Sequence, residues 1–517
     1  MTTNQLIRIP SFFLFLMLCL SLPTTAPAEN ITFIKEYTYM ASDIDSKVSS
    51  RAIALEQTKR ALLEQMGTYL FSETEVKNYQ ISKDQVTMLT AGIVSAEIID
   101  EKWDGRTYYL KAKMAADPKE VAKSVDALRK DEQKSKELSE SKKRAEEAMK
   151  EVERLKNELE SVRTDTRKQR EYSDAIKDLI ATDWFDRGVA FQKSNDFKNA
   201  IEAYNNSIKM NSQYETPYYN RGIAYFELGN KQQAIKDYDK AIELNSQYAA
   251  AYNNRGFVYS ELGNKQQAIK DYDKVIELDP QDAQAYSNRG GAYSDLGNQQ
   301  QAIKDYEKAI SLNPQEALFY FNRGIAYSKS GNERQAIIDY DKAIKLNPLY
   351  AKAYSNRGIA YNALGNGKQA ISDCNKAIEL NPQFVAAYNN RGLSYYALGN
   401  YQQAIRDYSK AIELDPQYAM AYANRSNAYA ALGDRKQTIK DCDKAIELNP
   451  EFAGAYYNRG FAYYYLGNQQ QAIKDYDKAI ELNPQFSEAY RNRGVAYHSI
   501  GKKKQALKDY DKALAVC

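Results

Sequence analysis

Residues 249–282 read AAAYNNRGFVYSELGNKQQAIKDYDKVIELDPQD, and this stretch decides the fold of the larger part of the chain. Two sets of small and aromatic residues in it recur at helical spacing, each on one face of a helix. The residues that share these faces are Tyr252, Gly256 and Tyr259 in the first set and Ala268, Tyr272 and Val275 in the second. The stretch therefore predicts two consecutive amphipathic helices.

A stop signal and a start signal lie between these two helices. Gly263 suits the left-handed conformation that follows a helix end, and Asn264 can cap the next helix. Gln267, three residues later, can complete a capping box with Asn264. Pro280 closes the second helix because it cannot continue the hydrogen-bond ladder. The unit is predicted to be a helical hairpin.

The same pattern returns every 34 residues through the C-terminal part of the chain. The triplet Asn-Arg-Gly begins at 220, 254, 288, 322, 356, 390, 458 and 492, and Asn-Arg-Ser begins at 424. An earlier copy carries Asp186-Arg187-Gly188, so ten repeats span 181–517. One hairpin cannot bury its apolar face alone, and neighbouring hairpins must stack into an α-solenoid.

The spacing of Tyr252, Gly256, Tyr259, Gly263, Ala268, Tyr272 and Pro280 resembles the tetratricopeptide repeat (TPR). This resemblance implies a mainly α fold, a right-handed superhelix of ten hairpins whose first helices line the concave side. Four positions depart from the pattern in ways that change the core. They are Ser426 and Thr438, in place of Gly and Ala, and Cys374 and Cys442, in place of the second-helix Tyr.

A row of asparagines is predicted to face the groove. Asn254 lies about 200° round its helix from the buried Tyr252, so it should point away from the helix pair. The row consists of Asn220, Asn254, Asn288, Asn322, Asn356, Asn390, Asn424, Asn458 and Asn492. An amide offers both a donor and an acceptor, which match the backbone of an extended segment. The row is similar to the asparagine ladder of long TPR superhelices that bind such segments.

Apolar residues share this stripe: Phe257, Ile325, Ile359, Leu393 and Phe461. We therefore expect the groove to hold an extended or helical segment of a protein or peptide partner. The alternative is that the asparagines are solvated polar residues repeated by duplication.

An arginine adjoins the buried face of each first helix and needs a partner for its charge. Asp271 on the second helix is the obvious partner of Arg255, and the same pair recurs from Arg221 with Asp237 to Arg493 with Asp509. We predict a structural Arg–Asp pair in repeats 2–10. Repeat 1 departs, because Ala203 stands in the place of the aspartate.

The first 28 residues are typical of a secretory signal peptide. Arg8 is their only charge, residues 12–22 are apolar, and Ala26-Pro27-Ala28 has the form of a cleavage site. The apolar run is too short to span a bilayer. We expect cleavage after Ala28, an exported and most simply periplasmic product, and no integral membrane span after cleavage.

Residues 29–117 predict a small α+β domain. The expected elements are strands at 31–39 and 70–79, helices at 47–66 and 83–90, and a hairpin of 92–102 with 107–115 through Asp104-Gly105. Residues 118–180 are charged and contain no Gly or further Pro after Pro118. Apolar residues at heptad spacing within 138–162 favour a coiled coil, either a homodimer through this seam or a solvated linker helix.

The composition argues against an enzyme. His498 is the only histidine, and three cysteines remain after the signal segment: Cys374, Cys442 and Cys517. No phosphate-binding loop, nucleophile elbow or metal-ligand cluster is present in the sequence, so we expect no catalytic residues, metal or cofactor. A net charge of +3 argues against nucleic acid as a partner. The leading hypothesis is an interaction scaffold in the cell envelope; the alternatives are a structural component of an export or secretion assembly, and an enzyme in the N-terminal domain.

Overall fold

The chain forms two compact units in a computed structural model, one ending at Ala251 and the other beginning at Tyr252. The residues described are 30–72, 82–130, 132–161 and 165–516. The expected signal peptide, most of the strand expected at 70–79, and Cys517 lie outside these residues. Within these ranges no helix is both long enough and apolar enough to cross a bilayer.

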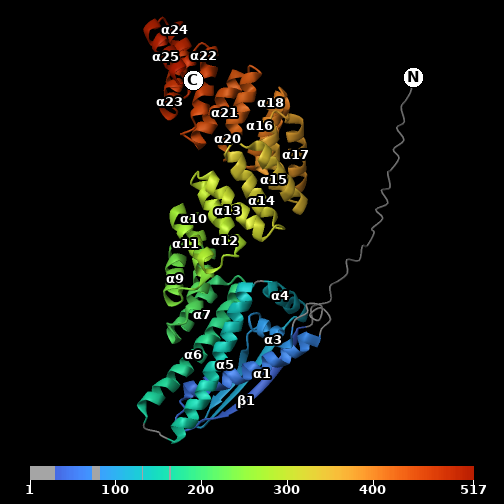
Figure 1. The fold of residues 1–517 in the computed structure, drawn as a ribbon, viewed down its shortest axis with the longest axis vertical. Coiled ribbons are helices and arrows are strands. Elements are labelled where there is room, and N and C mark those ends of the chain that lie inside the picture. The colour runs from blue at the N-terminus through green and yellow to red at the C-terminus, as the bar shows by residue number, and fades with distance from the viewer. Residues whose placement is uncertain (1–29, 73–81, 131, 162–164, 517) are drawn as a thin grey trace, which may run out of the picture. The chain divides into compact units, whose positions relative to one another are not determined.

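The first unit opens with a three-stranded antiparallel sheet of order β1-β3-β2 (Figure 1). Its strands are β1 (Ile31–Met40), β2 (Glu97–Trp103) and β3 (Thr107–Ala116). Gly105 adopts a φ of +97° in the β2–β3 turn, and Asp104 Oδ1 accepts the backbone N–H groups of Arg106 at 2.9 Å and Thr107 at 2.6 Å. The hairpin predicted through Asp104-Gly105 is confirmed.

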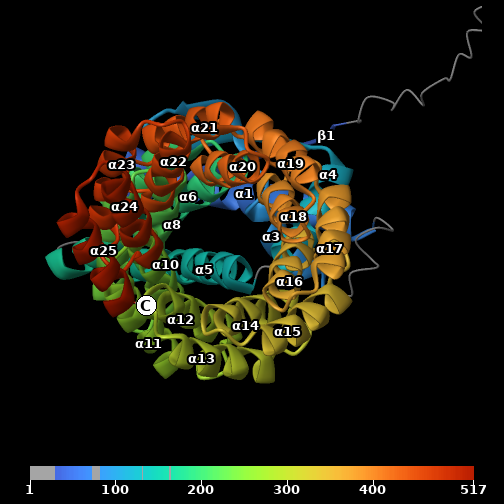
Figure 2. The same cartoon turned by 90° about the horizontal axis from the view of Figure 1, so that it is seen from above.

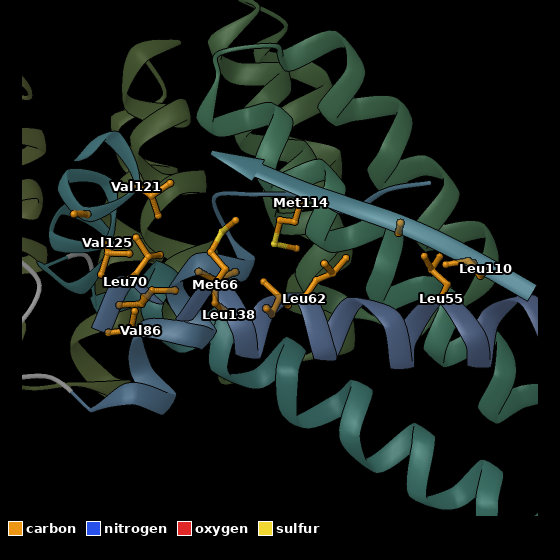
Figure 3. Packing of buried hydrophobic residues seen from close by; sticks show 14 of the residues in the cluster. Leu55, Leu62, Met66, Leu70, Val86, Leu110, Met114, Val121, Val125 and Leu138 are labelled. Carbon is orange, nitrogen blue, oxygen red and sulfur yellow. The ribbon is translucent and has the colours of Figure 1, made fainter. Parts of the chain in front are cut away.

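Helix α1 (Lys47–Ser72) packs on this sheet, and α3 (Lys83–Ala91) packs on α1. Figure 3 shows Leu62 and Met66 of α1 beside Met114 of β3. Leu70 continues the four-residue spacing of Leu62 and Met66 and is 1% exposed, so the helix persists to Ser72. The prediction of a strand from residue 70 is therefore wrong over 70–72.

Residues 118–180 form no single long helix. They belong to α4 (Pro118–Lys130), α5 (Glu132–Ser161) and α6 (Thr166–Lys193). Helices α5 and α6 are antiparallel, since Ser141 early in α5 donates to Asp186 late in α6 at 2.9 Å. At the other end, Lys168 pairs with Glu158 at 2.8 Å.

The predicted heptad seam is buried inside this chain. Val152, Leu155 and Leu159 are at most 1% exposed and share a cluster with Tyr172 and Ile176 of α6. A homodimer through 138–162 would need these same side chains, so the structure corrects that prediction to an intramolecular hairpin. Heptad spacing indicates that an apolar seam exists and leaves its partner open.

Helix α6 also supplies the first helix of repeat 1, so the boundary expected at 180/181 lies within a continuous helix. The other repeat helices of the first unit are α7 (Phe197–Met210), α8 (Glu215–Glu227) and α9 (Lys231–Leu244). Helix α10 (Ala249–Glu261) crosses from the first unit into the second.

The second unit continues as stacked hairpins, each with a 13-residue first helix. In Figure 2, α12, α14, α16, α18 and α20 lie on the inner side of its curve and α13, α15, α17, α19 and α21 on the outer side. The helices are α11 (Lys265–Leu278), α12 (Ala283–Asp295), α13 (Gln299–Leu312), α14 (Ala317–Lys329), α15 (Glu333–Leu346), α16 (Ala351–Ala363), α17 (Gly367–Leu380), α18 (Val385–Ala397), α19 (Tyr401–Leu414), α20 (Ala419–Ala431), α21 (Arg435–Leu448), α22 (Ala453–Tyr465), α23 (Gln469–Leu482), α24 (Ser487–Ser499) and α25 (Lys503–Ala515). The predicted α-solenoid is confirmed.

The turn between α10 and α11 has the predicted glycine and the predicted asparagine cap. Gly263 has a φ of +81°, in the left-handed region that favours glycine. Asn264 Oδ1 then accepts the backbone N–H of Gln267 at 3.3 Å and caps α11. A Cβ on Gly256 would lie 3.0 Å from a ring carbon of Tyr272 and 3.2 Å from Cβ of Asp271, so the two helices require the missing side chain.

The predicted Arg–Asp pairs form in all nine of repeats 2–10. In each pair Nη2 donates to Oδ1 at 2.6–2.8 Å and Nε donates to Oδ2 at 2.7–2.9 Å. The carboxylates are buried, which makes these two-pronged bonds part of the core. In repeat 1, Arg187 instead pairs with Asp183 of its own helix at 2.8 Å.

Most of these arginines also reach back to the preceding repeat, which we did not predict. Arg289 Nη1 donates to Asp273 at 2.6 Å, and Arg459 and Arg493 make the equivalent bond at 2.7 Å. Each such guanidinium joins its own hairpin to the second helix of the repeat before it.

The departures at 426 and 442 compensate each other. Most repeats pack a tyrosine ring against glycine, whereas repeat 8 packs Cys442 against Ser426, and both are fully buried. The smaller thiol leaves space for the serine, whose hydroxyl donates to the carbonyl of Ala423 at 2.7 Å. Burial raises the pKa of both Cys374 and Cys442 to about 12. Both thiols are therefore buried, as predicted, and almost fully protonated at neutral pH.

Candidate partner-binding groove

A hollow of about 370 Å³ lies across α10, α12 and α14, the first helices of repeats 3, 4 and 5. Four predicted groove residues line it: Phe257, Asn288, Asn322 and Ile325. Small hydroxyl side chains and charged residues complete the wall, among them Ser260, Ser287, Ser294, Lys265, Asp295 and Lys329. The repeat period thus brings residues from three hairpins to one surface.

The asparagine amides bridge successive first helices. Asn288 Nδ2 donates to Asn253 Oδ1 at 3.0 Å, and Asn424 Nδ2 donates to Asn389 Oδ1 at 2.9 Å. The same amide position binds a different acceptor elsewhere: Ser355 Oγ for Asn390, Asn427 Oδ1 for Asn458 and the Tyr457 hydroxyl for Asn492. In these five asparagines one N–H of the amide is therefore already used to space neighbouring repeats.

These inter-repeat bonds were not predicted, because the pattern within one hairpin does not show which residue of the neighbouring repeat lies opposite. The acceptor usually lies 35 residues before the asparagine, one position and one repeat away. An uncharged polar residue at that offset was the available signal. Of the predicted row, Asn288 and Asn322 line the hollow.

Asn220 is the exception to the predicted row. It is 3% exposed, and its Nδ2 donates to Glu137 of α5 at 2.9 Å and to the Thr216 carbonyl at 3.2 Å. Asn220, the first asparagine of the row, is covered by α5 of the same chain, so we correct the prediction of a partner-binding role for Asn220. The other eight asparagines of the row, from Asn254 to Asn492, are all half-buried.

The apolar members of the stripe differ in exposure. Phe257 is 45% exposed and Ile359 is 42% exposed, whereas Ile325, Leu393 and Phe461 are half-buried. Large apolar side chains left in water on a concave wall are available for burial against a ligand.

Four charged residues line the hollow, and the two carboxylates of Glu261 and Asp295 balance the two cations of Lys265 and Lys329. Lys265 Nζ lies 2.6 Å from a carboxylate oxygen of Asp295 and donates to Ser260 Oγ at 2.9 Å. Lys329 donates to Ser294 Oγ at 3.3 Å. This part of the groove is therefore polar and close to neutral.

Repeats 8 and 9 present a different wall. The guanidinium carbon of Arg435 lies 4.8 Å from the ring centre of Tyr465 and 5.3 Å from that of Phe461. The two rings lie 4.7 Å apart, and Tyr464 meets Tyr465 edge-on at 5.5 Å. We predicted a groove role for Phe461 alone, because this cluster forms between repeats.

No metal-binding group is evident in the described ranges, where no three His, Cys, Asp or Glu side chains are placed to share an ion. His498 is exposed on α24. The arrangement offers amides, hydroxyls, rings and one stacked guanidinium, which are groups that bind polypeptides.

Models of the tetratricopeptide repeat match the chain continuously over 188–517. The matched segments are 188–229, 224–263, 249–282, 271–304, 291–331, 317–350, 351–384, 385–418, 419–452, 453–486 and 487–517. A search of curated protein sequences finds no match.

Several solved structures are similar to parts of the chain. A tetratricopeptide repeat protein from Parabacteroides merdae is 22% identical, with a TM-score of 0.41 over 50% of this chain and 99% of its own. MamA protein is 30% identical, with a TM-score of 0.30 over 34% of this chain and 95% of its own. YrrB, described as a TPR protein with an unusual peptide-binding site, is 27% identical, with a TM-score of 0.30 over 36% of this chain and 95% of its own.

Proposed function

Because this chain belongs to the tetratricopeptide-repeat family, we propose that it is a non-enzymatic scaffold that holds an extended or helical segment of a protein partner along its first helices. The observation that supports this best is the groove wall itself. Two half-buried amides, Asn288 and Asn322, share the hollow across α10, α12 and α14 with the apolar side chains of Phe257 and Ile325, and the hollow is open to a ligand.

The chemistry of the wall favours recognition of a main chain. Amide oxygens and N–H groups can pair with the backbone of any sequence, and the apolar residues between them cover the ligand's side chains. Stacked helices lie roughly 10 Å apart, and an extended peptide rises about 3.3 Å per residue. One asparagine of the row would therefore meet about every third residue of the ligand.

We also propose that the protein works in the cell envelope, on the basis of the signal-like composition of residues 1–28. A fusion of these residues to a reporter enzyme that is active only outside the cytoplasm tests this point. Activity of the fusion supports export, and a reporter retained in the cytoplasm contradicts it. A structural role in an export or secretion assembly is the second candidate within the same location.

The central experiment replaces Asn322, Asn356 and Asn390 together with alanine in the full chain. Random peptides displayed on phage are selected on the parent protein, and the affinities of synthetic copies are measured for both proteins. We expect the triple variant to bind at least tenfold more weakly, since two or three hydrogen bonds of about 1 kcal/mol each are lost.

A matched control changes Asn313, Asn347 and Asn381 to alanine. These three exposed residues follow the second helices of repeats 4–6 and lie outside the groove. The control triple should keep the parent affinity. Equal affinities of the parent and the groove variant, both folded by circular dichroism, would remove the amide row from the proposal.

A further inference from the structure

The cluster around Arg435 differs from the equivalent position five repeats earlier. Lys265 occupies that position in repeat 3 and is neutralised by Asp295 at 2.6 Å. In repeat 8 the residue is Arg435, and the residue in the place of Asp295 is Tyr465. A carboxylate that completes one site is thus replaced by an aromatic ring in the other.

The charge of Arg435 has no carboxylate partner in the described part of the chain. Its one hydrogen bond runs from Nη1 to the Ala430 carbonyl at 2.6 Å, and its other contacts are the rings of Phe461 and Tyr465. A guanidinium carries five N–H donors, and carboxylates accept two of them side by side. The rings and the carbonyl hold the group in place, so little side-chain entropy remains to be lost on binding.

The ring of Tyr465 is 59% exposed although it belongs to this ordered cluster. Tyrosine and arginine are the residue types that most often dominate binding energy at protein interfaces. The amide bridge between Asn458 and Asn427 lies in the same two repeats and offers backbone recognition beside the rings.

We propose that Arg435, Phe461 and Tyr465 form a specificity site for a partner segment in which an Asp or Glu side chain stands within two residues of an aromatic or large aliphatic one. The acid pairs with the guanidinium, and the apolar side chain covers Tyr465. This assignment rests on the function proposed above and names the partner's chemistry. Alternate residues of an extended segment face the same side about 7 Å apart, which suits an acid at one position and a ring two positions on.

The test selects internally displayed random peptides on the full chain and on Arg435→Gln. Glutamine is natural at this repeat position, as Gln299 and Gln469, so the variant should fold. Lys444→Gln is the matched control, because it removes from the same helix, α21, a cation whose charge is already paired with Glu447 at 2.7 Å. We expect acid-plus-apolar peptides to dominate the selection on the parent and the control, and to be lost on Arg435→Gln.

Synthetic copies of the enriched peptides, capped at both ends, then separate the contributions. Exchanging the acid for its amide should weaken binding to the parent about tenfold and leave binding to Arg435→Gln unchanged, as expected for one charged hydrogen-bonded pair. Tyr465→Ala, with the alanine found naturally at 363, 397 and 431, should weaken binding of the same peptides and preserve their preference for the acid.

Several outcomes would overturn the assignment. Enriched peptides without acids would remove the specificity site and leave the scaffold function standing, whereas no enrichment on the parent would contradict both. Preference for a free C-terminal carboxylate, binding of a single-stranded oligonucleotide that Arg435→Gln abolishes, or self-association abolished by that substitution would each assign the site to another occupant.

Discussion

The two units hold their helices together by different means. From residue 252 onward, the same Arg–Asp pair and glycine turn recur at fixed offsets in every hairpin, and the amide bridge recurs in several of them. Before residue 252, the contacts that join α1, α5 and α6 occur once each, such as Lys59 of α1 with Asp186 of α6 and Ser141 of α5 with Asp186. A contact that recurs at a fixed spacing can be recognised in the sequence, whereas a contact that occurs once leaves no such pattern.

This difference also separates the two kinds of surface. In the periodic unit the eight asparagines of the row are half-buried. In the first unit, α5 lies over Asn220 and buries it. Asn220 is therefore not open to a partner, although it belongs to the same sequence row.

The largest expected effect tests the repeated ion pair. Asp373→Ala removes a buried carboxylate from Arg357 and should destabilise repeat 6 by about 3–5 kcal/mol, because the guanidinium is left partly buried without its partner. Hydrogen exchange should show lost protection in α16 and α17, with the sheet and α1 unchanged.

Asp341→Ala is the control for that measurement. Asp341 binds the same guanidinium from the preceding repeat, and its side chain is 52% exposed. Its loss should cost less than about 1 kcal/mol. Equal losses of protection in the two variants would contradict the prediction that the buried pair of Arg357 with Asp373 contributes most of the stabilisation.

A smaller effect is expected from the contact that occurs once in the first unit. Lys59→Met leaves Asp186 and Asp183 without their shared cation between α1 and α6 and should cost about 2 kcal/mol. Exchange should quicken in α1 and α6 while the second unit keeps its protection. Lys177→Met, which breaks an exposed pair with Asp174, should leave the protection of both units unchanged. If Lys59→Met lowered protection only in the second unit, the two units would not be stabilised independently.

The next prediction concerns the compensated departure in repeat 8. Cys442→Tyr should destabilise this repeat by about 1–3 kcal/mol, because the ring would meet the side chain of Ser426. Adding Ser426→Gly restores the pattern of the other repeats and should recover at least half of the loss. Strict additivity of the two changes in denaturant titrations would show that the residues do not compensate.

The smallest effect distinguishes two helix caps at the same repeat position. Asn264 caps α11 through its side chain, whereas Asn366 makes no side-chain cap bond to α17. Asn264→Ala should cost about 1 kcal/mol and Asn366→Ala only a few tenths. Thermal unfolding monitored by circular dichroism of both variants measures the difference, and a reversed order would contradict the assignment of the caps.

Most of the solenoid could be predicted from the sequence, because each feature is local or periodic. Gly263, Asn264 and the pair of Arg255 with Asp271 were predicted within one hairpin, and the structure places them as expected. The β2–β3 hairpin followed from Asp104-Gly105 for the same reason.

The contacts that prediction missed join segments with no fixed offset, or join one repeat to the next. Leu155 and Leu159 signal an apolar seam, yet nothing in their spacing says that α6 covers it. Glu137 reaches Asn220 from 83 residues away. Arg435 meets Tyr465 across a repeat boundary, and the pattern within one hairpin does not predict such a contact.

The fixed offsets have a consequence for how such a chain can change its length. Each Arg–Asp pair spans 16 residues, its backward bond spans 16, and the amide bridge usually spans 35, all set against a period of 34. Insertion or excision of one whole period therefore keeps the offset of the Arg–Asp pair and of the backward bond at the new junction. The solenoid can thus change its length by whole repeats while these offsets are preserved.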